Sequence, residues 1–117
     1  QKTNIIIPAT KVLNEQNNSE CVSYYEKSLE KNANCYLAFR GLGNFYLKNQ
    51  QFDKSEKNYT HAIEINENRF GPIYKNRGYV RQQQNKMDEA KHDYQDYIKF
   101  TPTAKDRGMI ERALNEM

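Results

Sequence analysis

The chain has 117 residues, of which 37% are hydrophobic and 28% charged, with a formal net charge of +3. This length suits one small domain, and no apolar run within it approaches the roughly 20 residues that cross a bilayer, which excludes a membrane-spanning helix. Mean hydropathy is low, at -1.08, but nine tyrosines and five phenylalanines supply the large buriable side chains that disordered chains lack.

The first 35 residues carry a weak helical pattern. Pro8 suits the first position of a helix, and the small or apolar residues from Cys21 to Leu29 predict a second helix over 20–31. Such a helix, at ~1.5 Å per residue, would hold Cys21 and Cys35 too far apart for a disulfide. Because Gln1 is not methionine, we expect a processed form or an excised fragment.

Residues 36–69 and 71–104 are two copies of one pattern, and residues 21–29 match the second half of it. The matched pairs keep size or chemistry: Phe39 with Tyr74, Gly43 with Gly78, Phe52 with Met87, Ser55 with Ala90, Tyr59 with Tyr94, and Ile63 with Ile98. Chemistry that recurs at a fixed spacing predicts a repeat architecture.

Each copy divides into two helical segments joined by a polar turn, at 49–51 and at 84–86. Glycine inside a helix costs about 1 kcal/mol relative to alanine. Gly43 and Gly78 at matched positions therefore predict a close approach of the facing helix, with Ser55 or Ala90 on it.

These features resemble the tetratricopeptide repeat, a helical hairpin of about 34 residues. The residues that carry the resemblance are Phe39, Leu42, Gly43, Tyr46, Ser55, Tyr59 and Ala62, then Tyr74, Gly78, Ala90, Tyr94, Tyr97 and Pro102. The resemblance implies an all-α superhelical array of antiparallel hairpins. We expect a single domain over 1–117, with a degenerate first repeat at about 2–35, full repeats at 36–69 and 71–104, and a capping helix at 105–117.

The last repeat departs from the family pattern. Arg77 stands at the usual leucine position, Arg81 at the second aromatic position, and Tyr97 where alanine is normal. Glu67 replaces the terminal proline of the preceding repeat. The changes in the last repeat suggest that it is adapted to its cap.

The resemblance places the ligand site on the inner face, which the first helix of each hairpin forms. The segments 36–51 and 70–87 contain no Asp or Glu, whereas the second helices carry acids, so we predict a basic inner face. The predicted peptide-binding residues are Arg40, Asn44, Leu47, Lys48, Lys75, Asn76, Tyr79 and Gln82. Such a groove suits an acidic or C-terminal segment of a partner protein, because arginine and asparagine hydrogen-bond carboxylates and backbone.

Two modes of peptide binding stay open. Arg40, Asn44 and Asn76 are similar to the first three residues of the clamp with which some tetratricopeptide domains hold a C-terminal carboxylate. Lys105 and Arg107 are candidates for its further basic places, with Ile110 or Glu111 at the other place. The alternative is a less specific groove for acidic peptides.

No catalytic, cofactor or metal site is predicted, since the acids are dispersed and Asp88, His92 and Asp96 have no evident fourth ligand. Nucleic-acid binding is disfavoured, because +3 is a weak electrostatic footprint. The alternative functions are a helper domain of a larger protein and a structural domain that forms homo-oligomers through Ile5, Ile6, Ile7, Val12 and Leu13. Two unpaired cysteines favour the cytoplasm, and a processed N-terminus leaves a periplasmic or secreted location open.

Overall fold

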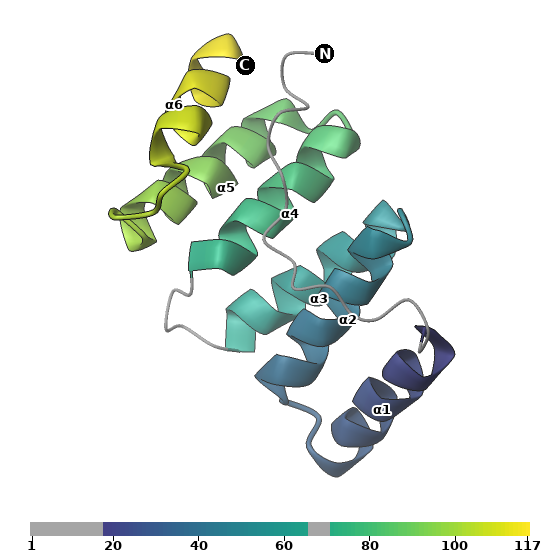
Figure 1. Cartoon of the computed structure of the whole chain (residues 1–117). Helices are drawn as coiled ribbons and strands as arrows, with labels where there is room; N and C mark the ends of the chain where they lie inside the picture. The colour runs from purple at the N-terminus through teal and green to yellow at the C-terminus, as the bar shows by residue number, and fades with distance from the viewer. Residues whose placement is uncertain (1–17, 66–70) are drawn as a thin grey trace. The chain divides into compact units, whose positions relative to one another are not determined.

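The computed structural model describes residues 18–65 and 71–117, which form α-helices and, within these ranges, no strand. The helices are α1 (Asn18–Lys31), α2 (Tyr36–Lys48), α3 (Phe52–Ile65), α4 (Gly71–Gln83), α5 (Met87–Phe100) and α6 (Arg107–Glu116) (Figure 1). The all-α class is confirmed. The chain divides into two compact units, one with α1 to α3 and one with α4 to α6, and each is described separately.

Several sequence predictions fall outside the described residues. They are the helix starting at Pro8, the apolar surface around residues 5–13, the first half of the leading repeat, the side chain of Cys21 and the residue at position 67.

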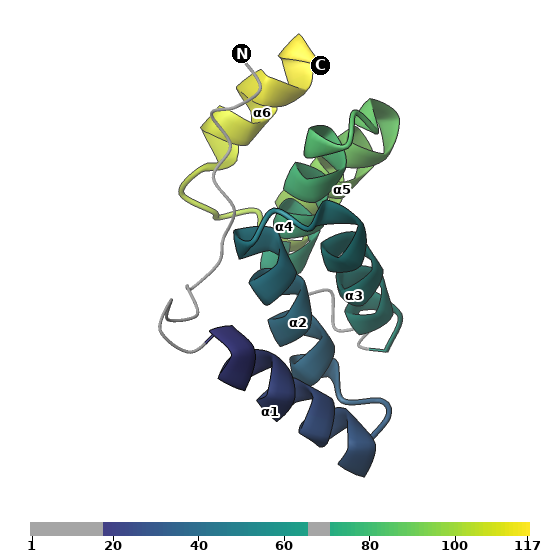
Figure 2. The same cartoon turned by 90° about the vertical axis from the view of Figure 1, so that its right-hand side faces the viewer.

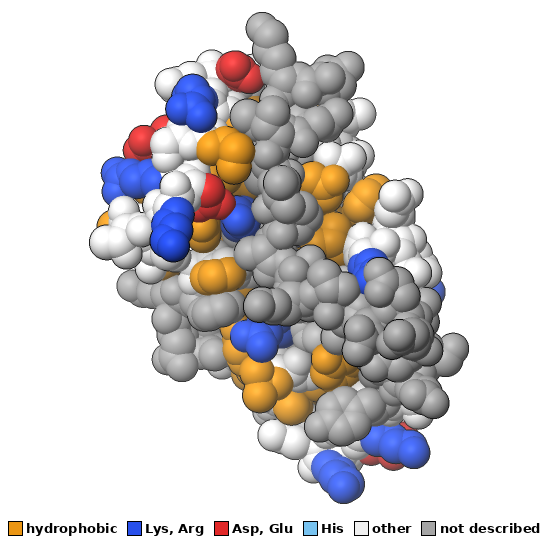
Figure 3. Space-filling model, viewed as in Figure 1, with side chains coloured by type: hydrophobic (Ala, Val, Ile, Leu, Met, Phe, Trp, Pro, Cys, Tyr) orange, Lys and Arg blue, Asp and Glu red, His pale blue; other side chains and the backbone are white. Residues whose placement is uncertain are grey.

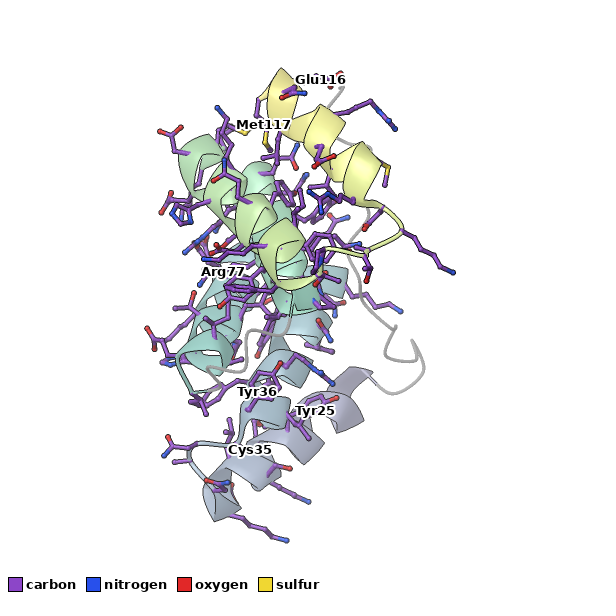
Figure 4. The ribbon with its side chains drawn as sticks, turned by 90° about the vertical axis from the view of Figure 1, so that its left-hand side faces the viewer. Tyr25, Cys35, Tyr36, Arg77, Glu116 and Met117 are labelled. Carbon is purple, nitrogen blue, oxygen red and sulfur yellow. The ribbon has the colours of Figure 1, made fainter. Side chains whose placement is uncertain are left out.

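In the first unit, α2 and α3 form an antiparallel hairpin and α1 packs along α2 (Figures 1 and 2). The Tyr25 side chain extends from α1 onto Gly41 of α2, where an added methyl group would overlap the ring (Figure 4). Apolar residues at three- and four-residue spacing supply the buried side of the hairpin. They are Ala38, Leu42, Leu47, Tyr59 and Ala62.

The predicted close approach at Gly43 is confirmed. Ser55 Oγ donates a hydrogen bond to the Gly43 carbonyl oxygen at 2.8 Å. The Tyr59 ring fills the space beside the glycine, since a Cβ there would lie 2.5 Å from Tyr59 Cδ1. The glycine therefore accommodates the tyrosine, and the serine adds a hydrogen bond between the two helices.

In the second unit, α4 and α5 form the equivalent hairpin and α6 lies against α5 (Figures 1 and 2). A Cβ at Gly78 would lie 2.8 Å from Tyr94, which repeats the arrangement at Gly43. The core of this unit joins α5 to α6 and consists of Ala90, Tyr94, Tyr97, Ile110 and Ala113.

Both hairpin turns have the same backbone conformation. Gln50 and Asn85, at matched positions, have positive φ angles of 61° and 63°. After α2, the Gln51 N–H bonds to the Tyr46 carbonyl at 2.9 Å, and after α4 the Lys86 N–H bonds to the Arg81 carbonyl at 2.8 Å. These are the hydrogen bonds of a Schellman motif, in which one left-handed residue ends the helix. The repeat is therefore preserved in the backbone as well as in the side chains.

None of the helices in residues 18–65 and 71–117 combines the length and the apolar character that crossing a membrane requires.

Candidate functional site

The exposed side of α2 carries three polar residues at four-residue spacing. Arg40, Asn44 and Lys48 share one face of the helix, and all three are half-buried. The sequence of α2 contains no acidic residue. The Arg40 guanidinium lies 5.8 Å from the centre of the Tyr36 ring, close enough for a cation–π contact that orients the charge.

Asn44 is positioned from the neighbouring helix. The Tyr59 hydroxyl, which projects from α3, donates a hydrogen bond to Asn44 Oδ1. Because the amide oxygen accepts this bond, the amide group of Asn44 is held in one orientation. A buried aromatic residue thus determines the orientation of an asparagine on this face of α2.

Leu47 does not belong to an open binding surface. Its side chain is 6% exposed and lies in the core, so the prediction that it offers an apolar contact to a ligand is corrected. An apolar residue one position before Lys48 points to a different side of the helix because successive side chains are rotated by about 100°.

On α4, Lys75 is already paired. Its Nζ donates to Asp106 Oδ2 at 2.7 Å and lies 5.3 Å from the centre of the Tyr97 ring. The Tyr97 hydroxyl donates to the other oxygen, Asp106 Oδ1, at 2.6 Å. Lys75 is only 8% exposed. The predicted binding lysine is therefore part of an internal cluster of Lys75, Tyr97 and Asp106, which we call the cap cluster.

The cap cluster shifts the acidity of two of its members. Burial raises the pKa of the Asp106 carboxyl, but hydrogen bonds from Lys75 and Tyr97 and the charge of Lys75 outweigh burial, so this pKa lies below its ordinary 3.8. The pKa of Tyr97 is raised, first by burial and then by its hydrogen bond to Asp106. Asp106 is therefore held as the carboxylate and Tyr97 as the neutral donor.

The other predicted residues of α4 are mostly buried. Asn76 and Gln82 lie in the interior, and Gln82 Oε1 accepts a 2.8 Å hydrogen bond from the Tyr94 hydroxyl. Burial, followed by the charge of Asp93, raises the pKa of Tyr94 well above its ordinary value. Tyr79 is half-buried and packs against the core of the unit. Of the predicted binding residues of α4, Asn76 and Gln82 are therefore interior, Lys75 is paired with Asp106, and Tyr79 is half-buried.

Arg77 and Arg81, which lie in the acid-free segment predicted to be basic, both bind Asp93 of α5; Figure 4 labels Arg77. Arg77 binds Asp93 with both oxygens engaged, at 3.0 Å from Nε and 2.8 Å from Nη2. Arg81 Nη1 adds a third bond to Asp93 at 3.0 Å, and Asp93 is 1% exposed. This cluster of two arginines and one aspartate joins α4 to α5, so these two arginines neutralise an acid of the second helix.

The candidate clamp residues near the C-terminus differ in their environments. Arg107 Nε donates to Glu111 Oε2 at 3.0 Å and Arg107 Nη1 to the Pro102 carbonyl oxygen at 3.1 Å, while Lys105 is exposed. Ile110 is fully buried. Figure 3 shows basic and acidic side chains intermingled around α6. This surface has a mixed rather than a basic character.

The histidines lie beside acids on second helices. His92 Nδ1 is 3.7 Å from Asp96 Oδ2, and His61 Nδ1 is 3.9 Å from Glu64 Oε1. In the part of the chain that the structure describes, no three His, Cys, Asp or Glu side chains come together as a metal site would require.

Sequence reasoning missed the two aspartates that organise α4. From the sequence, Asp93 is only one of several acids on a second helix, and Asp106 has no predicted role. A signal for Asp93 was present in the two arginines at apolar positions, because buried cations need a buried acid.

The comparisons with known proteins agree with this geometry. The sequence model of the tetratricopeptide repeat matches residues 41–69. A search of curated protein sequences gave no match.

Two solved structures are similar in fold, each with a TM-score of 0.76. The Arabidopsis OM64 TPR domain is 20% identical, and the alignment covers 86% of this chain and 83% of that one. The second TPR domain of the human RPAP3 protein, solved by NMR in complex with the HSP70 peptide SGPTIEEVD, is 21% identical, with coverage of 88% and 85%.

Domains of this kind typically mediate protein–protein interactions without catalysis. The helical hairpins and the glycine–tyrosine contacts agree with these findings: the chain has the fold of a tetratricopeptide-repeat domain, and one segment of it matches the sequence model of that repeat.

Proposed function

We propose that this chain is a non-catalytic module that binds an acidic segment or a C-terminus of a partner protein, with α2 as the principal binding helix. The observation that carries the proposal is the acid-free face of α2, where Arg40, Asn44 and Lys48 stand at successive turns. A ligand carboxylate near this face would meet no acidic residue on its own helix. The predicted acids of the hairpin, such as Glu64, lie on α3.

The α2 residues have complementary roles in this proposal. Arg40 offers a planar pair of donors to a carboxylate, which lysine cannot do. Asn44, oriented by Tyr59, recognises the peptide backbone. Lys48, two turns away from Arg40, attracts a second acidic group at a distance of about 12 Å along the helix. This spacing suits an extended peptide with acids several residues apart.

Support also comes from the fold relative that was solved with a peptide. The peptide SGPTIEEVD held by the human RPAP3 domain is acidic at its C-terminal end. It is therefore a suitable first probe for this chain.

The test is isothermal calorimetry with SGPTIEEVD and with the same peptide in which the acids are replaced by their amides. Removing a hydrogen bond to a charged group costs about 1.5–3 kcal/mol, so Arg40→Gln should weaken binding of the acidic peptide by about tenfold or more. The amide peptide should bind weakly to both proteins.

The matched control is Lys57→Gln, because Lys57 is an exposed lysine on α3 and its replacement changes the net charge equally. We expect this variant to bind like the unsubstituted chain. Equal affinities for Arg40→Gln and Lys57→Gln would show that the α2 face is not the binding site.

A further inference from the structure

The cap cluster presents a carboxylate to a predicted ligand-binding lysine. Asp106 Oδ2 lies 2.7 Å from Lys75 Nζ, and the two side chains are 21% and 10% exposed. This is the distance of a charge-assisted hydrogen bond to a ligand carboxylate. The α4 lysine is therefore occupied by an acid from the chain itself.

Asp106 is directed toward α4 and α5 rather than toward its own helix. It stands at the N-cap of α6, where an aspartate normally accepts a bond from the first backbone N–H groups. Its side chain makes no such bond. Instead it accepts hydrogen bonds from Lys75, which is 31 residues earlier, and from Tyr97.

Resting on the proposed function, we propose that Asp106 is an internal competitor for acidic ligands, which occupies Lys75 and so determines which carboxylates α4 accepts. A tethered group acts at an effective concentration in the millimolar range or above. A ligand carboxylate must displace it, so the apparent affinity is the intrinsic affinity multiplied by the fraction of molecules in which Lys75 is not bound to Asp106. The α4 face then selects ligands that carry more than one acid.

The carboxylate can leave Lys75 without undocking α6. Ile110 and Ala113 anchor α6 in the core of the unit, and both are fully buried. The backbone around Asp106 is held by bonds from the Ala104 N–H to Thr101 O and from the Arg107 N–H to Ala104 O. Neither anchor involves the Asp106 side chain, so its replacement by asparagine removes the charge and leaves the helix in place.

The experiment measures binding of fluorescently labelled SGPTIEEVD by anisotropy to four forms of the full chain: unsubstituted, Asp106→Asn, Glu89→Gln and the double variant Asp106→Asn with Lys75→Gln. Glu89 is an exposed acid on α5, so Glu89→Gln raises the net charge as much as Asp106→Asn does. Any gain beyond that of Glu89→Gln is specific to the cap cluster.

We expect Asp106→Asn to tighten binding about fivefold or more, within the usual range for coupled equilibria, and Glu89→Gln to change it less than about twofold. The double variant should lose the gain, since Lys75 is the group that Asp106 restrains. Tyr97→Phe, which removes the second hydrogen bond to Asp106 and keeps its charge, should give a smaller gain in the same direction.

Circular dichroism shows whether Asp106→Asn is folded, and Tyr97→Phe replaces it as the test if it is not. Absence of a gain in the folded variant, or a gain that persists without Lys75, would overturn the inference. If the unsubstituted chain binds through Arg40 while Asp106→Asn matches Glu89→Gln, only this inference fails. If no form binds the peptide, the proposed function fails as well.

Discussion

At the scale of single residues, the glycines of the first helices and the glycine of α6 occupy opposite environments. A Cβ at Gly43 or Gly78 would lie 2.5 Å from Tyr59 or 2.8 Å from Tyr94. A Cβ at Gly108 would meet only the end of the Arg112 side chain, at 3.9 Å. The same glycine-to-alanine change therefore has opposite effects at the two kinds of site.

We predict that Gly43→Ala and Gly78→Ala each lower the free energy of unfolding by about 1–3 kcal/mol, because overpacking against a buried ring outweighs the better helix propensity of alanine. Gly108→Ala should raise it by about 0.5–1 kcal/mol, since only propensity acts there. Urea denaturation followed by circular dichroism measures all three.

The contrast is its own control, because the covalent change is identical at each position. Stabilisation by alanine at Gly43 would contradict the contact with Tyr59, and destabilisation at Gly108 would contradict the exposed placement of α6 at that residue.

At the scale of elements, the two hairpins share a backbone plan and differ in what joins their helices. The repeat at 36–69 has Leu42, Tyr46 and Asn58 at the positions where the repeat at 71–104 has Arg77, Arg81 and Asp93. The ion cluster of α4 and α5 therefore replaces an apolar pair and an amide. Buried ion pairs contribute little net stability compared with apolar packing, but removing one partner leaves an unpaired charge.

We predict that Asp93→Asn lowers the free energy of unfolding by about 3–5 kcal/mol, because Arg77 and Arg81 lose their shared carboxylate in a buried site. The triple variant Arg77→Leu, Arg81→Tyr and Asp93→Asn, which installs the residues of the other repeat, should regain most or all of this loss. Thermal and urea denaturation of both variants test the prediction. A triple variant less stable than Asp93→Asn alone would show that the cluster is not equivalent to the apolar pair.

The helices and their turns could be predicted because their determinants are local. Apolar and small residues three or four positions apart specify helix faces, and the matched residues Gly43 and Gly78 identified the helix contact before the structure did. The predicted turns at 49–51 and 84–86 are where α2 and α4 end.

The binding surface could be predicted only in part, because long charged side chains form ion pairs with residues that are distant in sequence. Lys75 and Arg77 were assigned to an inner face from their place on a helix, yet each reaches an acid on another segment, at Asp106 and Asp93. Helical spacing fixes the position of the Cα atom of a residue. The charged group of a long lysine or arginine side chain can then reach a carboxylate on another segment, which the spacing does not predict. Arg40, Asn44 and Lys48, at successive turns of α2, remain a predicted binding face.

At the scale of the whole molecule, folding shifts the pKa values of three groups in the unit of α4 to α6. Folding lowers the pKa of Asp106 and raises those of Tyr94 and Tyr97. A lowered carboxyl pKa means that the folded chain binds the proton less readily than the unfolded chain. A raised tyrosine pKa means that the unfolded chain releases its proton first.

We predict that the free energy of unfolding is highest at intermediate pH and falls both at acid pH (the acid limb) and at alkaline pH (the alkaline limb). The contribution of Asp106 is present above its ordinary pKa of 3.8 and is lost as the pH falls through the lowered value in the folded chain. The contributions of Tyr94 and Tyr97 are complete below their ordinary pKa of 10.0 and decline as the pH rises above it. Urea denaturation across this pH range gives the profile.

The variants separate the limbs. Asp106→Asn should flatten the acid limb and also reduce the Tyr97 part of the alkaline limb, because Asp106 helps to raise the pKa of Tyr97. Tyr94→Phe should reduce the alkaline limb with little effect on the acid limb. An acid limb that is unchanged by Asp106→Asn would mean that other carboxylates govern it.

The cluster of Arg77, Arg81 and Asp93 also restricts how this sequence can diverge. Any single replacement of its aspartate by a neutral residue removes the carboxylate that both half-buried arginines bind, and replacement of either arginine weakens the neutralisation of a buried acid. The three positions can therefore change together at little cost but not one at a time. Among related chains, these three positions should therefore be conserved or substituted together, although they lie on two different helices.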